Sequence, residues 1–346
     1  MLLARVRFCL RLGETAEARA LLARLPSLEH LPTRQQMEAH LHLGRVAVTQ
    51  GDIPAYRYHY PRALVLARQI NHPEGLAISL SELEIQHNYD GRHMAEITAL
   101  LERVSDQWVQ RRIYLFLGTV SIRHRRYRET CAHWQKVLEI SLTLEDVYSV
   151  AMMYNNLGDA LREAGDFAAV EESFQQAMHL SEVLHYQSLC KNALEGWARL
   201  CVLQGDYERA LPMAQESAAL CRAGSDRMGE VAALACMGHA YAGLGQWSQA
   251  ENAYSQAAAL LPEIPHLALE SLAGLAYVCW KGGQVADARK YIERFLASLE
   301  QVDIDGFASP VLSYGRVADV LRALGEQAQA DALLARQNPA DASVHW

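Results

Sequence analysis

The sequence feature that most constrains the fold is a unit of about 40 residues that recurs along almost the whole chain. Its clearest copy runs from Tyr154 to Ser181 and predicts two amphipathic helices joined by a tight turn. Within each helix, apolar and small residues three or four positions apart share one face. A single pair cannot bury both of these faces, so the unit becomes stable only when it stacks against neighbouring copies.

The turn of this unit lies at Gly165 and Asp166. Glycine tolerates the left-handed conformation in which many helices end, and an aspartate can cap the helix that follows. The second helix then places Val170, Phe174 and Ala177 on one face, which we expect in the core. The turn position recurs at Gly13, Gly51, Gly91, Arg125, Gly165, Gly205, Gly245, Gly283 and Gly325.

The unit resembles the tetratricopeptide repeat. The resemblance rests on the small residue Gly158, the turn Gly165-Asp166-Phe167, the aromatic Phe174 and the small Ala177. Tetratricopeptide units commonly span about 34 residues. The longer unit here looks most like the sensor region of MalT-type bacterial regulators, and also like the C-terminal helical region of large ATPase-linked transcription regulators.

The resemblance implies an all-α fold, a right-handed α-solenoid (superhelix) of about eight to nine helix pairs, because such units stack in one direction. We expect this solenoid to cover residues 1–336 as one elongated domain and to be followed by an irregular tail at 337–346. Solenoids normally end in polar caps. Because the chain starts at Met1 with an apolar helix, we expect it to be the C-terminal part of a longer regulator.

Three units near the start depart from the pattern. In the second unit, Pro54 lies just after the turn, where a helix start tolerates proline. Pro61 lies further in and should end or kink that helix. The third unit, around Gly91, is the most degenerate, and the fourth has Arg125 in place of the turn glycine.

Composition narrows the class of protein. A net charge of −8 argues against a chain that binds nucleic acid directly, since such binding depends on cationic neutralisation of phosphates. No apolar run approaches the length needed to span a bilayer. The seven cysteines form no CxxC pair. Cys201 and Cys279 fall at a buried repeat position, so we expect reduced core thiols in a cytoplasmic protein.

The sequence carries no motif that indicates catalysis. It has no phosphate loop, no HExxH, no GxSxG and no dinucleotide fingerprint. The histidines do not occur in the close pairs that a structural zinc site needs; His40 and His42, for example, face different ways on one helix. We therefore expect no enzymatic activity, no catalytic or metal-binding residue and no cofactor.

The remaining candidate for function is the inner wall of the solenoid. In proteins of this fold the first helix of each unit lines that wall, and its second, fifth, sixth, ninth and twelfth positions are not core positions. We expect these to bind a protein or peptide partner. An asparagine there can donate to and accept from a ligand backbone. The candidate partner-binding residues are Asn155, Asn156, Asp159, Arg162, Asn192, Glu195, Arg199, Arg112, Arg123 and His239.

Asn155 and Arg199 are the main candidates among them. If both are exposed on this wall, replacing either with alanine should leave stability nearly unchanged. The alternative is that Asn155 only satisfies a neighbouring helix. The lysine and asparagine of the carboxylate clamp that binds chaperone C-termini are absent from the matching positions, so that function is not implied.

Six arginines gather between Arg111 and Arg128 without an Asp or Glu between them. They could form a patch for an anion or acidic partner. The alternative is a solvated turn that happens to be basic.

Two functions follow from these observations. The first is the sensor or interaction region of a bacterial signalling or transcription regulator, for which a small-molecule inducer is also open. The second is a freestanding scaffold or adaptor that holds a peptide or partner subunit in its groove. A fused or adjacent ATPase or DNA-binding domain would favour the first, and its absence the second. A third class, an enzyme with a cryptic site, has no residues to support it.

Overall fold

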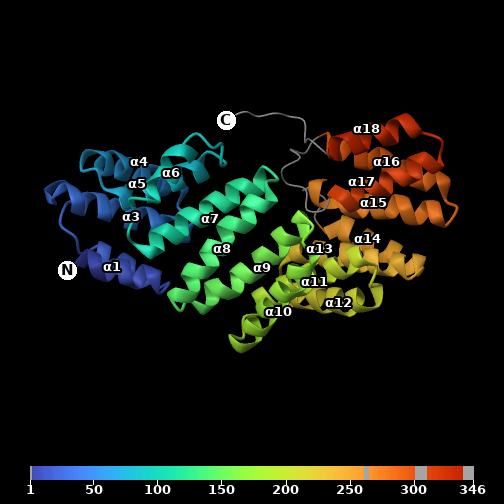
Figure 1. Cartoon of the computed structure of the whole chain (residues 1–346), viewed down its shortest axis with the longest axis horizontal. Coiled ribbons are helices and arrows are strands. Elements are labelled where there is room, and N and C mark those ends of the chain that lie inside the picture. The colour runs from blue at the N-terminus through green and yellow to red at the C-terminus, as the bar shows by residue number, and fades with distance from the viewer. Residues whose placement is uncertain (1, 261–264, 301–309, 338–346) are drawn as a thin grey trace. The chain divides into compact units, whose positions relative to one another are not determined.

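The computed structural model describes residues 2–260, 265–300 and 310–337, and within these the chain forms eighteen α-helices, one short 3-10 helix and no strand (Figure 1). The α-helices follow one another as nine pairs, which confirms the predicted all-α solenoid of helix pairs. The chain divides into two compact units, Met1–Glu145 and Asp146–Trp346. Whether residues 1–336 act as one domain, as the sequence predicts, stays a prediction.

The first unit contains four helix pairs. They are α1 (Leu2–Arg11), α2 (Thr15–Leu22), α3 (Thr33–Gln50), α4 (Ile53–Gln69), α5 (Pro73–Gln86), α6 (Met94–Leu100), α7 (Gln107–Arg123) and α8 (Tyr127–Thr143), with the 3-10 helix η1 (Leu28–His30) between α2 and α3.

The second unit contains five helix pairs. They are α9 (Val147–Ala164), α10 (Phe167–Val183), α11 (Gln187–Gln204), α12 (Tyr207–Ala223), α13 (Arg227–Gly243), α14 (Trp247–Leu260), α15 (Pro265–Lys281), α16 (Val285–Leu299), α17 (Pro310–Ala323) and α18 (Gln327–Gln337). Gln337, the first residue of the predicted irregular tail, belongs to α18, and residues 338–346 lie outside the described residues.

Within each unit, the first helix of a pair also packs against the first helix of the next pair. In the second unit α9, α11, α13, α15 and α17 contact one another in this order, and α10, α12, α14 and α16 pack beside them. We call the first helices of the second unit its inner layer. Its inner face consists of the residues at the second, fifth, sixth, ninth and twelfth positions of these helices.

The turns between paired helices have the predicted backbone conformation. The eight predicted turn glycines all have positive φ, from +68° at Gly51 to +83° at Gly325. Arg125 adopts the same conformation with φ +56°, although it carries a side chain. The fourth unit therefore keeps the turn geometry without the glycine that usually supplies it.

The core repeats one contact, a large ring against two glycines. Phe174 of α10 is fully buried, and a Cβ on Gly158 of α9 or on Gly196 of α11 would lie 2.7 or 2.5 Å from its ring. Tyr254 of α14 makes the same close approach to Gly238 of α13 and to a glycine of α15. Only glycine fits at these positions, because the ring occupies the space of a side chain.

Most of the predicted core is confirmed. Val170, Phe174 and Ala177 are all buried, as are Cys201 and Cys279. None of the seven cysteines, all of which lie in the described part of the chain, forms a disulfide. The cytoplasmic location inferred from them stays a prediction.

Two local predictions need correction. α4 continues through Pro61, so this proline does not end the helix, and the alternative of a kink stays a prediction; Tyr60 and Ala63 on either side are buried, and their packing stabilises the helix. Asp166 occupies the N-cap position of α10, but its side chain accepts no capping hydrogen bond. Asp206 and Asp226, at the matching position of α12 and α13, do accept one.

We predict that Phe174→Ala lowers the free energy of unfolding by about 3–5 kcal/mol, because it empties a site enclosed by two helices. Phe167→Ala provides a matched control, since Phe167 begins the same helix and is 42 % exposed. Its loss should change stability by about 0.5 kcal/mol or less. Urea denaturation followed by circular dichroism measures both, and equal losses would contradict the packing described here.

Candidate functional site

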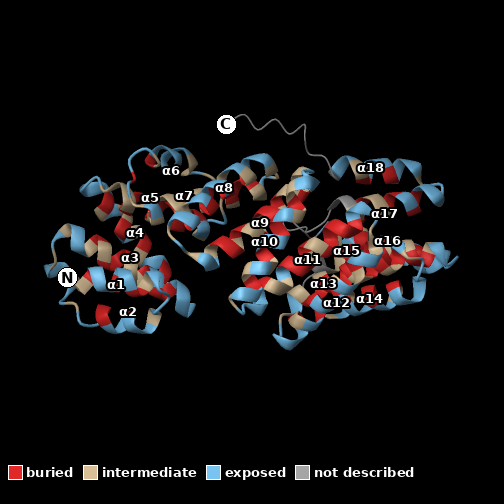
Figure 2. Cartoon of the chain, turned by 60° about the horizontal axis from the view of Figure 1, so that its bottom comes forward, coloured by how far each residue is buried: buried red, intermediate tan, exposed pale blue. Residues whose placement is uncertain are grey.

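The candidate site is the inner face of the second unit. In Figure 2 the buried residues of this unit gather where α11, α13 and α15 lie together. Several of the side chains that the sequence assigned to partner binding are here, and the structure connects most of them to one another. They form a chain of ion pairs and hydrogen bonds.

Arg199 of α11 is the centre of this chain. Its guanidinium lies 2.7 Å from Glu195 Oε1 on the same helix, and it donates to Glu270 Oε1 of α15 at 2.5 Å. The residue is only 3 % exposed. The Arg199–Glu270 pair therefore connects two helices that are separated along the chain by the α12–α14 segment.

Glu270 also binds His239 of α13. Its Oε1 lies 2.7 Å from His239 Nε2. Because a carboxylate only accepts, Nε2 carries the proton and Nδ1 is an acceptor. Nδ1 faces the hydroxyl of Tyr254 at 2.6 Å and the guanidinium of Arg316 on α17. The imidazole thus joins α13 to α14, α15 and α17.

This environment keeps His239 neutral and Glu270 charged. Burial, followed by the charge of Arg316, lowers the pKa of His239 to about 4. Burial acts to raise the pKa of Glu270, but Arg199 and the hydrogen bond from His239 outweigh it and hold the pKa well below its usual range.

A second ion pair belongs to α9. Arg162 Nη1 donates to Asp159 Oδ1 at 2.8 Å, and Nη2 lies 3.3 Å from Glu163 Oε1. The same guanidinium reaches the carbonyl oxygen of Gly196 on α11 at 3.5 Å. Arg162 is buried, so its charge is satisfied within the chain.

Asn155 differs from these residues. It is 6 % exposed, and its side-chain oxygen Oδ1 has no hydrogen-bond partner. It lies on α9 one turn before Asp159. Of the other predicted asparagines, Asn156 is half-buried and Asn192 is exposed. The partner-binding role of all three stays a prediction.

In the first unit, Arg112 of α7 forms an ion pair with Glu82 of α5. Glu82 is buried and accepts a second hydrogen bond from Tyr56 at 2.9 Å. Arg123 donates to Asn88 at 3.1 Å and lies over the ring of Tyr89. Both predicted arginines of this unit are therefore engaged in contacts within the chain.

The arginines between Arg111 and Arg128 do not all point to one patch. Arg111 lies over the ring of Trp108, with 4.3 Å from its guanidinium carbon to the ring centroid. Arg126 pairs with Glu129 at 3.1 Å. A binding role for this stretch stays a prediction.

These contacts correct the expectation that the candidate wall residues are exposed. Arg199 and His239 are buried in the network, and Arg162 is buried against Asp159. The physical reason is that charges of opposite sign occupy wall positions of neighbouring helices, and each charge removed from water needs such a partner. Arg199→Ala is therefore no longer expected to leave stability unchanged.

Glu270, Arg316 and Glu82 are not among the residues predicted from the sequence, although they occupy the same repeat positions. Glu270 is the second position of its unit, as Met152 is in the fifth unit. Arg316 and Glu82 are sixth positions, like Asn156. Applying the same five positions to every unit would have identified these residues, but it would not have shown which of them form pairs.

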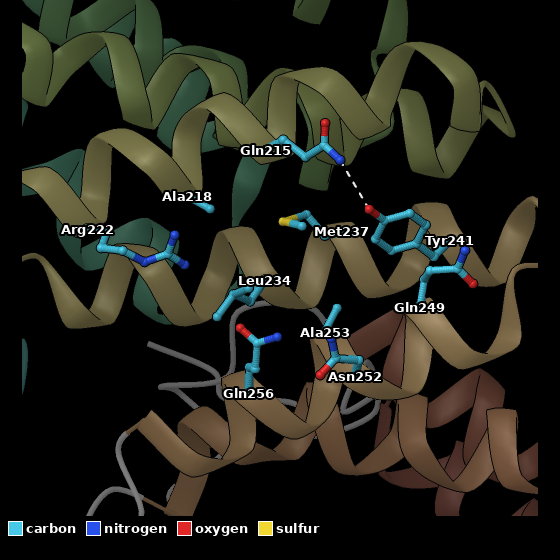
Figure 3. A pocket seen from close by; sticks show the side chains of 10 residues that line it. All are labelled: Gln215, Ala218, Arg222, Leu234, Met237, Tyr241, Gln249, Asn252, Ala253 and Gln256. Carbon is cyan, nitrogen blue, oxygen red and sulfur yellow. Dashed lines mark hydrogen bonds between the residues drawn. The ribbon is translucent and has the colours of Figure 1, made fainter.

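A separate pocket of about 370 Å³ lies between α12 and α14, over α13 (Figure 3). Its lining comprises Ala218, Leu234, Met237, Tyr241 and Ala253 with the polar residues Gln215, Arg222, Gln249, Asn252 and Gln256. Met237 is two residues from His239, so the pocket and the inner face lie on opposite sides of α13. The side-chain amides that line this pocket can both donate and accept hydrogen bonds.

Among the described residues, one group could hold a metal ion: the ligand atoms of Cys9, Glu14 and Glu17 lie within 4.8 Å of one another. Both glutamates are solvent-accessible, and such carboxylates commonly lie close together without an ion. The expectations of no metal, no cofactor and no catalytic residue stay predictions. None of the helices in the described part of the chain is long and apolar enough to cross a membrane.

Family models of the tetratricopeptide repeat match residues 2–24, 150–185, 191–263 and 237–302. No curated protein sequence matches the chain.

Three solved structures show the same fold at low identity. The apo form of RapI has a TM-score of 0.74 and 11% identity, and the match covers 99% of both chains. NprR in complex with its cognate peptide NprX has a TM-score of 0.61, 15% identity and 88% coverage of both chains. A signal transduction ATPase with a tetratricopeptide repeat sensor, from Pyrococcus horikoshii, has a TM-score of 0.59 and 16% identity; the match covers 97% of this chain and 51% of that one.

Stacked helix pairs, left-handed turn residues and rings packed on glycines define an α-solenoid built from short repeats. The inner layer of such a fold presents one helix per repeat. With the family models matching four segments, this chain is a tetratricopeptide-repeat protein.

We predict that Arg199→Ala lowers the free energy of unfolding by about 3–5 kcal/mol, because Glu195 and Glu270 lose the cation between them. Arg209→Ala is the matched control, since Arg209 pairs with Glu171 at 2.9 Å at the surface. Losing that exposed pair should cost about 1 kcal/mol or less. Urea denaturation compares the two, and a similar small loss for both would show that Arg199 does not hold the network together.

We also predict that His239 makes stability depend on pH. An unfolded histidine takes up a proton near pH 6.5, whereas folded His239 does so only near pH 4. Stability is therefore lost as pH falls through this window, because the unfolded state binds more protons. Glu270 adds a loss only at lower pH, below the pKa of an unfolded glutamate.

The measurement is urea denaturation between pH 6 and pH 5. His239→Gln should reduce the slope of stability against pH by roughly 1 kcal/mol per pH unit. His179→Gln, at an exposed position of α10, should leave the slope as it is in the parent. An unchanged slope in His239→Gln would mean that the imidazole titrates alike in both states.

Proposed function

We propose that this chain is a non-enzymatic scaffold that binds a protein or peptide partner on the inner face of its second unit. We further propose that it is the sensor or interaction region of a bacterial signalling or transcription regulator in the cytoplasm. The candidate contacts are the side chains of this face that the network leaves available, with Asn155 first among them. Asn156 and Asn192 lie on the same face, whereas Glu195, which also lies there, is paired with Arg199.

The observation that carries the proposal is the unpaired oxygen of Asn155. Burying a polar atom without a hydrogen bond costs about 1–3 kcal/mol. An alanine at this position would avoid that cost, so stability does not explain the asparagine. A backbone N–H from a bound segment would satisfy Oδ1, and an extended peptide offers one at every second residue on a side.

The comparisons support this proposal without testing it. NprR, which shares the fold, is described in complex with a peptide. The ATPase from Pyrococcus horikoshii carries a tetratricopeptide repeat sensor. Both are consistent with a repeat region that recognises a signal and passes it to another domain.

A freestanding adaptor is the second candidate. It is favoured by the match to RapI, which extends over 99% of both chains. The two candidates use the same inner face. A gene whose reading frame continues into an ATPase or a DNA-binding domain would favour the regulator, and a reading frame limited to the repeats would favour the adaptor.

We predict that Asn155→Ala weakens partner binding without lowering the melting temperature. The partner is first captured from native lysate on the immobilised parent chain and identified, and its affinity is then measured with purified components. Losing a buried hydrogen bond to the ligand should weaken binding about fivefold to tenfold. Because Oδ1 has no partner in the free protein, the melting temperature should stay the same or rise.

Gln175→Ala, at an exposed position of α10, is the matched control and should bind like the parent. Two results would reject the proposal. One is a drop of several degrees in the melting temperature of Asn155→Ala, which would make the residue structural. The other is unchanged binding by a folded Asn155→Ala variant.

A further inference from the structure

Arg316 of α17 has no carboxylate within ion-pair distance among the residues that the structure describes. It is half-buried, and its guanidinium donates to His239 Nδ1 and to the hydroxyl of Tyr254. The other two arginines of the inner face, Arg162 and Arg199, each contact two carboxylates. Arg316 therefore has only neutral hydrogen-bond partners.

The carboxylate that binds His239 does not contact Arg316. Glu270 binds His239 through Nε2, on the other side of the imidazole from Arg316. Since Nδ1 accepts from Arg316, the ring stands between this cation and that anion as a neutral group. A half-buried cation without a counterion is unfavourable, and an incoming anion would relieve this.

Arg316 lies against an aromatic ring, which also contacts a second cation and a second ring. Its guanidinium carbon is 5.4 Å from the ring centroid of Tyr277 on α15, and Lys281 Nζ is also 5.4 Å from that centroid. Lys281 lies in addition 4.4 Å from the ring of Trp280. Tyr277 and Trp280 are the ninth and twelfth positions of their unit, so this group continues the inner face defined above.

We propose that Arg316 binds a carboxylate of the partner and that Lys281, which lies against the same ring of Tyr277, adds positive charge beside it, so that the partner presents an acidic segment to this end of the inner face. A guanidinium binds a carboxylate through two parallel hydrogen bonds, and the ammonium group of Lys281 adds a second charge. This assignment rests on the proposed function, because it names the chemistry of the group that the same face receives.

The test uses defined probes on the whole chain. They are an N-acetylated, C-amidated alanine pentapeptide with a central glutamate, the all-alanine pentapeptide with a free C-terminus, its fully blocked form, and inorganic phosphate. The protein is labelled with 5-fluorotryptophan, and fluorine NMR follows Trp280, which lies 5.8 Å from Tyr277. Trp280→Phe assigns the resonance.

We expect the glutamate peptide to shift the Trp280 resonance and the fully blocked alanine peptide to leave it in place. Arg316→Gln should raise the Kd of the glutamate peptide about tenfold or more, and Arg316→Lys should restore part of the affinity. Arg289→Gln, which removes an exposed arginine of α16 paired with Glu326, should bind like the parent. A response to the free C-terminus alone would place a terminal carboxylate here, and a response to phosphate alone would overturn the assignment to an acidic segment.

Lys281→Gln keeps the proposal testable if Arg316→Gln unfolds, because Lys281 is exposed. It should raise the Kd about twofold to fivefold. The proposal is wrong if both blocked peptides shift Trp280 equally, or if the folded variants bind the glutamate peptide as the parent does.

The captured partner separates this inference from the proposed function. If Asn155→Ala weakens partner binding and Arg316→Gln does not, the inner face binds the partner but the carboxylate site is wrong. If Arg316→Gln weakens it and Asn155→Ala does not, the carboxylate site stands and the role of Asn155 is wrong.

Discussion

The contact of one large ring with glycines of two successive inner helices determines how closely the repeats of the second unit stack. Phe174 lies against Gly158 and Gly196, and Tyr254 lies against Gly238 in the same way. Any side chain on these glycines would push the helices apart, so the distances between inner helices depend on them. Tyr254 occupies the repeat position that Phe174 occupies two units earlier, and its additional hydroxyl group affects the inner face. The Tyr254 hydroxyl reaches His239, so a core ring becomes part of the polar network.

The close stacking explains why the buried charges of Arg162 and Arg199 on the inner face are paired. When inner helices approach this closely, charged side chains at their wall positions are removed from water and need partners of opposite charge. Arg199 meets this requirement with Glu195 and Glu270, and Arg162 does so with Asp159. The polar groups that the network leaves without a partner are therefore more informative about binding than the groups that it pairs.

The sequence predicted the turns and the core well, because both depend on local spacing. Gly165 ends α9, and Phe174 is buried, as the repeat pattern requires. The pairing of the wall residues could not be predicted, because Arg199 and Glu270 belong to different units and their distance depends on how α11, α13 and α15 stack. The continuation of α4 through Pro61 has the same origin, since tertiary packing around the proline outweighs its local preference.

Burial alone does not separate a structural residue from a binding residue on this face. Arg199 and Asn155 are both buried at wall positions, but their polar atoms differ in what they contact. Arg199 is satisfied, so its removal exposes two carboxylates to each other and the loss falls on the fold. Asn155 Oδ1 is unsatisfied, so its removal takes nothing from the free protein. The free-energy cost of this unsatisfied oxygen can be recovered only in a state that supplies the missing hydrogen bond, and the complex with a bound partner is such a state.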